Sequence, residues 1–379
     1  MPKIIVRSWG SRILGALTGC LLGLALIVGS FVLVFWNEGH GLHTVQALQE
    51  TEQVLVSVPI APIDPQNNLR PVYFSGLATT SEVLRDALLG VSQQALILVR
   101  TVEMYQWEQH TEAETQPQSG GSGREVKTYT YRPLWSERLI RSADFKEPQG
   151  HQNPEVLPFQ SRTLQAKSVK VGDYNLPPEF VRKMKGATML DLSRQNLTAL
   201  QQKTSKPVRH LDYRLYVGEN PQEPEIGDLK ITVSEILPQT VSVLAQQTGK
   251  TVQPYLAPSG QPVGLLAMGA QAPGQMIQQA ESKNRMLTWV FRLLSFFMMF
   301  IGFALILRPI VVFADRAPFF GRLIDFGGGL LAFTGGLFLW ALATALAWFA
   351  VRPVWSLSLI LIILLFCYIM FTHHEKQGD

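Results

Sequence analysis

Three long apolar stretches lie near the end of the chain, at residues 286–307, 326–351 and 354–371. A helix that crosses a bilayer needs about 20 mostly apolar residues, and residues 326–351 supply them without a charged side chain. The first stretch contains one charge, Arg292, and the third contains none. Because buried helices of soluble proteins are usually shorter and keep a polar stripe, we predict three membrane helices here.

A fourth apolar stretch, residues 13–36, follows a short basic segment at residues 1–12. A secretory signal peptide has an apolar part of only about 7–15 residues and a small-residue cleavage site. This stretch is longer and ends in Trp36-Asn37-Glu38. We therefore interpret it as a retained membrane helix, which brings the predicted number of membrane helices to four.

Small residues recur at intervals of four in two of these helices, where they let another helix approach closely. The two faces are suited to pack against each other. The helix-packing candidates are Gly15, Gly19 and Gly23 on the first helix and Gly328, Ala332 and Gly336 on the third.

Residues 37–285 have the composition of a water-soluble domain between the first and second membrane helices. Its first apolar positions have helical spacing and predict that the first helix extends outward by a turn or two. Beyond them the pattern alternates with a period of two, which is typical of strands, and a short helix is expected at 178–184. We predict a strand-rich α+β domain. The strand candidates are residues 54–58, 72–78, 95–107, 126–131, 169–171, 211–217, 229–233, 241–246 and 251–256.

Several short motifs occur in an order that resembles the LUMA family, also called the transmembrane-protein-43 family. The resemblance implies a membrane scaffold, because family members are known mainly in that role and no enzymatic activity is associated with them. The motifs are Phe35-Trp36-Asn37-Glu38-Gly39, Val102-Glu103-Met104-Tyr105-Gln106-Trp107, Gly150-His151-Gln152-Asn153-Pro154, Pro224-Glu225-Ile226-Gly227-Asp228-Leu229, Arg292, Leu307-Arg308, Asp315-Arg316, Pro318-Phe319 and Arg352-Pro353-Val354-Trp355.

The distribution of basic residues predicts the orientation. Lysine and arginine favour the cytoplasmic side of a membrane, which places residues 1–12, the interfacial loop 308–325 and the tail 372–379 in the cytoplasm. The domain then lies on the far side, in a periplasm or a lumen. We expect a bacterial inner membrane, or the endoplasmic reticulum or inner nuclear membrane in a eukaryote.

Charged and aromatic residues near the helix ends are expected at the membrane interface. Arg292 lies only about 9 Å into its predicted helix at 1.5 Å per residue, so its side chain can extend to the interface. A pathway or gating role for Arg292 is the less favoured alternative. The other interface candidates are Arg308, Arg316, Phe319, Phe320, Arg352 and Trp355.

The charge balance argues against nucleic acid as a partner. The net charge is +4, but residues 37–288 hold 24 basic and 25 acidic side chains, so the excess flanks the membrane helices. We find no basic cluster of the kind that phosphate backbones require. The lipid bilayer is the expected partner, with further copies of the chain and other membrane proteins.

The chain lacks the sequence motifs of common catalytic and metal sites. His40 and His43 are the best metal candidates, but no further ligand is evident, so no metal and no cofactor are expected. Both cysteines, Cys20 and Cys367, lie in apolar stretches, which excludes a disulfide framework in the domain. Asn196-Leu197-Thr198 matches a glycosylation acceptor that matters only in a eukaryotic secretory compartment.

These observations favour a non-catalytic membrane scaffold that self-associates and binds other proteins through its far-side domain. The alternative is a transport or channel protein, or a regulator of one, that uses the helix bundle around Arg292. Such a protein needs polar residues along a path, and the apolar stretches contain few. An enzyme is not expected.

Overall fold

The computed structural model describes residues 3–7, 9–117, 123–193, 195, 197–314 and 318–351. The chain forms two compact units. The domain unit comprises Met1–Lys3, Gln49–Ala113 and Lys127–Gln278, and the helix unit comprises Ile4–Leu48, Glu114–Val126 and Gln279–Asp379.

The described residues contain three long helices: α1 (Trp9–Val54), α4 (Pro273–Ala314) and α5 (Pro318–Val351). Each contains a segment long and apolar enough to cross a membrane, namely Ile13–Val54, Pro273–Ile310 and Gly329–Val351. Three of the four predicted membrane helices are thereby confirmed as helices of spanning length. The fourth, at 354–371, and the tail at 372–379 lie outside the described residues.

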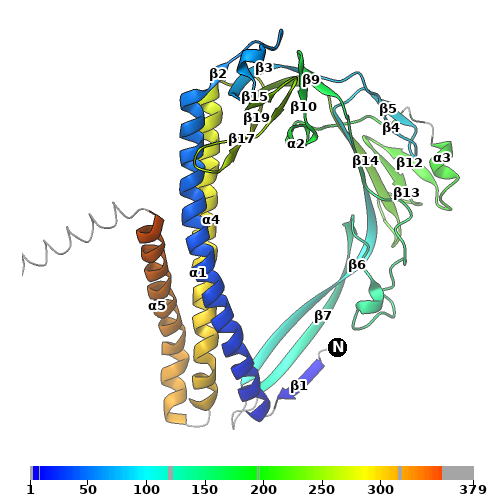
Figure 1. Ribbon diagram of the computed structural model, residues 1–379. Coiled ribbons are helices and arrows are strands. Elements are labelled where there is room, and N and C mark those ends of the chain that lie inside the picture. The colour runs from blue at the N-terminus through cyan, green and yellow to red at the C-terminus, as the bar shows by residue number, and fades with distance from the viewer. Residues whose placement is uncertain are drawn as a thin grey trace, which may run out of the picture. The chain divides into compact units, whose positions relative to one another are not determined.

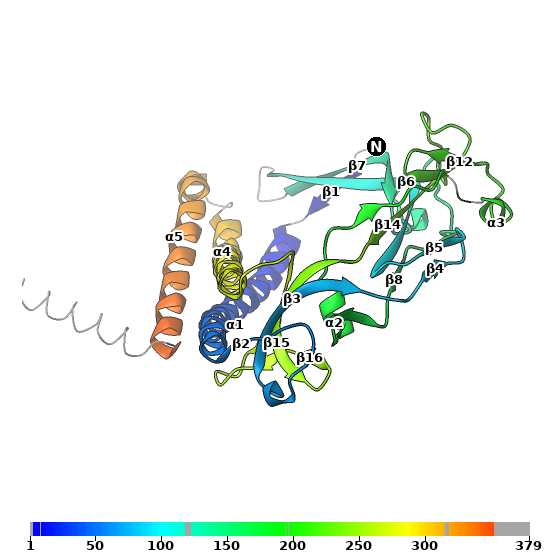
Figure 2. The same cartoon turned by 90° about the horizontal axis from the view of Figure 1, so that it is seen from above.

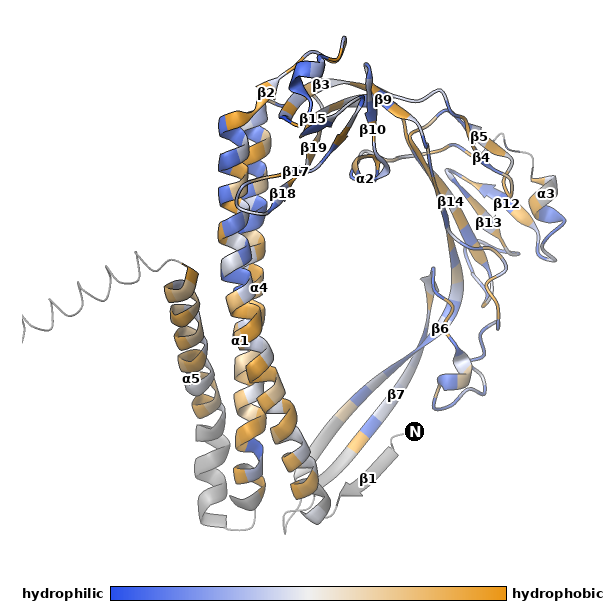
Figure 3. Ribbon diagram, in the orientation of Figure 1, coloured by the Kyte–Doolittle hydropathy of each residue, from blue (hydrophilic) through white to orange (hydrophobic). Residues whose placement is uncertain are grey.

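Helices α1 and α4 run side by side in two perpendicular views (Figures 1 and 2). Both extend further than the sequence predicts, because α1 continues to Val54 instead of ending shortly after residue 36, and α4 begins at Pro273. Hydrophobic residues dominate one half of each helix, and hydrophilic residues are frequent in the half nearer the domain strands in sequence (Figure 3). The membrane segments therefore continue as helices with a more polar surface.

The connection between α4 and α5 is much shorter than the predicted loop at 308–325. Helix α4 continues through Pro309 to Ala314, and α5 begins at Pro318. Proline removes one backbone donor but is tolerated in membrane helices, so the apolar residues after it stay helical. The prediction of a loop at 308–325 is wrong for most of these residues, because they belong to α4 or α5.

The first sheet has eight strands in the order β1–β7–β6–β14–β13–β12, with β8 beside β6 and β11 beside β14. Strand β1 lies in the segment for which the sequence analysis predicted only a cytoplasmic tail. The strands are β1 (Lys3–Arg7), β6 (Ile97–Pro117), β7 (Gly123–Ser136), β8 (Arg162–Gln165), β11 (Thr188–Met189), β12 (Val208–Leu211), β13 (Arg214–Val217) and β14 (Leu229–Ile236).

The second sheet has seven strands in the order β19–β15–β16–β10–β9–β3–β2, and β15 also pairs with β3. These strands are β2 (Val56–Ser57), β3 (Pro71–Thr79), β9 (Val169–Val171), β10 (Tyr174–Leu176), β15 (Gln239–Thr248), β16 (Thr251–Gln253) and β19 (Leu265–Met268). Two small hairpins and four short helices complete the described elements: β4 (Leu84–Asp86), β5 (Val91–Gln93), β17 (Tyr255–Leu256), β18 (Pro262–Val263), α2 (Pro178–Val181), α3 (Thr198–Gln201), η1 (Pro65–Asn67) and η2 (Ser142–Asp144).

Long antiparallel pairings between distant strands hold the domain unit together. Strand β6 pairs with β14 from Ile97↔Ile236 to Met104↔Leu229, and β3 pairs with β15 from Pro71↔Gln246 to Ala78↔Gln239. All four strands were predicted from their alternating pattern. Residues 211–217 do not form one strand, because β12 ends at Leu211 and Asp212 has a left-handed backbone (φ 52°).

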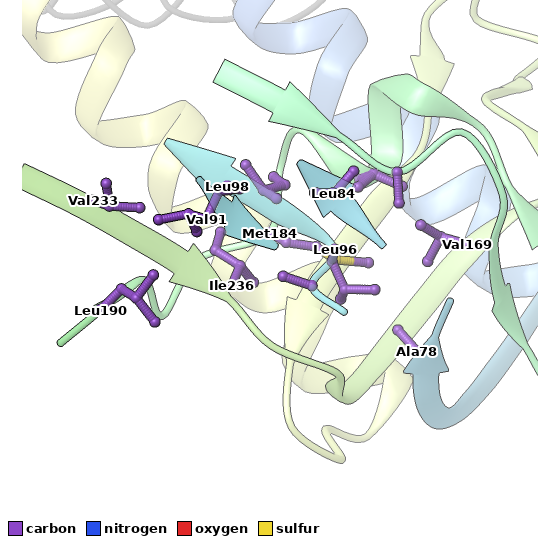
Figure 4. Close-up of a cluster of buried hydrophobic side chains, with 14 of the residues drawn as sticks. Ala78, Leu84, Val91, Leu96, Leu98, Val169, Met184, Leu190, Val233 and Ile236 are labelled. Carbon is purple, nitrogen blue, oxygen red and sulfur yellow. The ribbon is translucent and has the colours of Figure 1, made fainter. Parts of the chain in front are cut away.

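The buried faces of the strands form one hydrophobic core in the domain unit. The side chains of Leu96, Leu98, Met184 and Ile236 gather there (Figure 4). Along β14 the alternation places its odd-numbered apolar residues inside, as a half-buried strand requires. Residues far apart in the chain thus share one core.

Candidate functional site: a polar cluster between the membrane helices

An ion pair joins α1 to α4 within the helix unit. Arg292 Nε donates to Glu38 Oε1 at 2.6 Å, and Arg292 Nη2 donates to Glu38 Oε2 at 2.8 Å. The Glu38 side chain is 7% exposed and that of Arg292 is 16% exposed. This two-point geometry is the strong form of a carboxylate–guanidinium contact. Each charge therefore has its counter-charge in the neighbouring helix.

Two tryptophans enclose the ion pair. Trp348 of α5 donates its indole N–H to Glu38 Oε2 at 2.9 Å. The Arg292 guanidinium carbon lies 4.8 Å from the ring centre of Trp289 and 5.8 Å from that of Trp348. These are cation–π distances. The cluster of Glu38, Arg292, Trp289 and Trp348 therefore connects all three described membrane helices.

Neutral hydrogen bonds extend the contacts along the helices. Ser30 Oγ of α1 donates to the Ser295 carbonyl of α4 at 2.8 Å. Trp340 of α5 donates to the Arg292 carbonyl and to Ser295 Oγ, both at 3.1 Å. Asn37 donates to a carbonyl of α4 at 3.2 Å. Such bonds between helices satisfy polar groups that lipid cannot.

The small-residue faces meet α4 instead of each other, which corrects the predicted arrangement. A side chain at Gly23 would collide with the Gly302 backbone oxygen, 2.5 Å from the Cβ position, and one at Gly336 would lie 2.8 Å from Phe300 Cα. At these points α4 packs against the small-residue face of α1 and against that of α5. Gly15 has open space at its Cβ position.

The remaining packing candidates contribute unequally. Gly19 has an ordinary contact with Leu305 at 3.7 Å, and Ala332 is buried. The surroundings of Gly328 lie outside the described side chains. An apolar group from all three helices supports the packing: Val34, Met299, Ala343 and Ala347.

The predicted interface residues are only partly described. Arg308 is exposed on α4. Arg292 differs from the expected solitary side chain, because its guanidinium binds Glu38. The side chains of Phe319 and Phe320 are not described, and Arg316, Arg352 and Trp355 lie outside the described residues.

The pairing of Glu38 with Arg292 was not predicted from the sequence, although a signal was available. Glu38 directly follows the apolar part of the first helix, and Arg292 lies near the start of the apolar part of the next long helix. A chain that leaves and re-enters a membrane on the same side brings these two positions to the same level. An acid and a base at matching depth then predict an ion pair.

The two charges of the cluster pair with each other, and its neutral hydrogen bonds join neighbouring helices. Among the described residues no group of three His, Cys, Asp or Glu side chains is placed to hold a metal. His40 stacks on Trp36 with ring centres 5.0 Å apart. Cys20 is a free thiol, and Cys367 and Asn196 lie outside the described residues.

Two family motifs meet in the domain unit through amide side chains. Asn153 Oδ1 accepts from the Trp107 backbone N–H at 2.7 Å, and its Nδ2 donates to the Trp107 carbonyl at 2.9 Å. The fully buried Gln106 donates to the Arg138 carbonyl at 3.0 Å and accepts from the Ile140 N–H at 2.8 Å. Both residues fix loop backbone to β6, which is a structural role.

A third motif contains a buried aspartate with three donors. Asp228 accepts from Tyr216 Oη at 2.5 Å, from Lys206 Nζ at 2.6 Å and from the Glu225 backbone N–H at 2.9 Å. Burial and this carboxylate raise the pKa of Tyr216, which keeps the phenol protonated as a donor. Gly218 lies against Asp228 with no room for a side chain. These contacts order the turn before β14.

The helices, the ion pair that joins them and the strand-rich insertion define the class: an integral membrane protein with several candidate spans and a large domain between the first two. Within that class the chain belongs to the Transmembrane protein 43 family, whose model matches residues 104–353. This confirms the family to which the sequence motifs pointed.

Related animal proteins match most of the chain. Transmembrane protein 43 of Mus musculus and that of Homo sapiens are each 31% identical to it, over 89% of this chain and 86% of theirs. The Transmembrane protein 43 homolog of Drosophila melanogaster is 27% identical over 74% of each chain. These relatives give no support to the expected bacterial location. No solved structure matches.

Proposed function

We propose that the protein is a non-catalytic membrane scaffold that self-associates and binds other membrane proteins through its domain. The observation that carries the proposal is the mutual pairing of the charged and polar side chains in the helix unit. Glu38 accepts hydrogen bonds from Arg292 at both carboxylate oxygens and from Trp348 at Oε2. Such contacts hold the helices of the bundle in a fixed arrangement, as a scaffold requires.

The same pairing disfavours the transport alternative. A path for ions or solutes needs polar groups that are free to exchange partners with the solute. Here the charges of Glu38 and Arg292 form an ion pair. Ser30 and Ser295 are fully buried and hydrogen-bonded. The polar groups act as contacts between helices.

Thiol accessibility distinguishes a packed helix bundle from a bundle with a water-filled path. In a chain whose native cysteines are replaced, Ser30→Cys and Ser295→Cys should resist a water-soluble thiol reagent, because both positions are fully buried. The exposed Val156→Cys in the domain serves as the reactive control. Rapid labelling at Ser30 and Ser295 in a folded protein would favour a water-filled path and contradict the proposal.

Self-association through the domain is supported by open sheet edges. Strand β12 is at the end of the first sheet, and a strand at an edge presents unpaired backbone groups to other chains. With the native cysteines replaced, Arg209→Cys on β12 should form disulfide-linked dimers when a mild oxidant is added to the protein in mild detergent. Thr232→Cys on β14, which already has strands on both sides, is the control. Equal crosslinking at both positions, or at neither, would contradict association through this edge.

A further inference from the structure

We propose that Arg292, with Trp289 and Trp348, binds the phosphate of a phospholipid headgroup. Glu38 leaves some of the guanidinium donors of Arg292 unused. A guanidinium carries five N–H groups in two forks. Glu38 occupies the fork made by Nε and Nη2, and among the described residues Nη1 takes part in no hydrogen bond or ion pair. The second fork, made by Nη1 and the other N–H of Nη2, matches two oxygens of a phosphate.

The position of the pair selects a lipid as the source of that phosphate. Trp36, Trp289 and Trp348 come from three different helices and are 51%, 54% and 45% exposed. Tryptophans are enriched at the level of the headgroups. Trp289 and Trp348 contact the Arg292 guanidinium, and Trp36 contacts the ring of Phe291. The free fork of Arg292 therefore lies at the depth where phospholipid phosphates are concentrated.

The neighbours of Arg292 on α4 support a lipid over a protein carboxylate. Val290 is 51% exposed and Leu293 is 56% exposed, so an apolar surface flanks the guanidinium. Acyl chains can cover this surface while the phosphate contacts the fork. Because Glu38 neutralises Arg292, the site has no net charge of its own, and binding depends on the geometry of the donors.

Lipid retention tests the proposal. Full-length protein is purified in mild detergent from membranes of defined phospholipids, and the retained phospholipid is measured by native mass spectrometry. We expect Arg292→Lys to lower retention by about tenfold or more, because an ammonium keeps the charge but has no fork. The double variant Glu38→Gln/Arg292→Gln should lose retention to the same extent without leaving an unpaired buried charge.

Arg141→Gln is the control, because it removes an exposed arginine of the domain unit and should leave retention unchanged. Elution volume and circular dichroism establish that each variant is folded. Should the double variant fail to fold, Arg292→Lys alone decides the matter. Equal retention by the wild type and folded Arg292→Lys would overturn the proposal. Displacement of the lipid by inorganic phosphate at millimolar concentration would also overturn it, because the ligand would then be a free anion.

Discussion

The Glu38–Arg292 pair takes two charged groups largely out of water, and each depends on the other. Desolvating an ion costs several kcal/mol, which the partner and its hydrogen bonds offset only when the geometry is good. Here the contact is two-pointed, and Trp348 adds a third donor to the carboxylate. The pair therefore acts as a specific link between helices more than as a source of net stability.

Breaking the link on one side should be costly. Arg292→Gln leaves the Glu38 carboxylate buried without a counter-charge, so we expect a loss of about 3–5 kcal/mol. The double variant Glu38→Gln/Arg292→Gln should recover most of that loss because neither charge remains. Thermal unfolding in detergent, followed by size-exclusion fluorescence, measures both. A single variant as stable as the wild type would show that the pair is not buried in the membrane.

A second residue-scale prediction concerns an unpaired acid in the domain. Glu235 on β14 is 8% exposed, its Oε2 has no hydrogen-bond partner among the described residues, and burial raises its pKa. A raised pKa means that the folded state binds the proton more tightly than the unfolded state. The group therefore lowers stability as the pH rises above the ordinary value of 4.5 for the carboxyl, until the folded pKa is passed.

The substitution Glu235→Gln removes this penalty. We expect a higher unfolding temperature than the wild type at pH 7 and a difference that shrinks as the pH falls toward 4.5. The control Glu112→Gln, whose side chain is 73% exposed, should change the unfolding temperature little at either pH. A stabilisation by Glu235→Gln that is independent of pH would contradict the explanation.

At the scale of elements, local patterns were sufficient for some features and insufficient for others. The alternation in β3, β6, β14 and β15 predicted these strands because each has one face or both in the core. The continuation of α1 to Val54 was underestimated, because a helix supported by a neighbour needs no continuous apolar stripe. The contact of Arg292 with Glu38 spans 254 positions and depends on how the helices pair, which periodicity does not encode.

Helix packing gives a prediction with an internal control. Gly23→Leu would force a side chain into the Gly302 backbone of α4, whereas Gly15→Leu on the same helix enters open space. We expect Gly23→Leu to destabilise the helix unit by about 1–3 kcal/mol or more and Gly15→Leu to have little effect. Thermal stability in detergent compares the two. Equal effects would mean that α1 and α4 do not approach each other at Gly23.

At the scale of the whole molecule, the two units differ in what holds them together. The domain unit has a hydrophobic core and long strand pairings, as a water-soluble domain does. In the helix unit many apolar side chains face outward, among them Leu21 at 72% and Phe338 at 68% exposure. Surfaces of this kind are stable when lipid covers them. The membrane is thus a structural component of the helix unit.

The orientation of the chain is a prediction that rests on the basic residues near its start. The basic residues of the segment 1–12 favour the cytoplasm, with the domain on the far side.

Thiol labelling of intact cells tests this orientation. In a chain without its native cysteines, Pro2→Cys reports on the N-terminal segment and Val156→Cys on the exposed domain surface. From the charge distribution we expect an impermeant reagent to label Val156→Cys in intact cells and Pro2→Cys only after lysis. Labelling of both from outside would contradict the predicted orientation. The N-terminal basic residues would then not direct the orientation, and α1 would need an arrangement other than a single crossing.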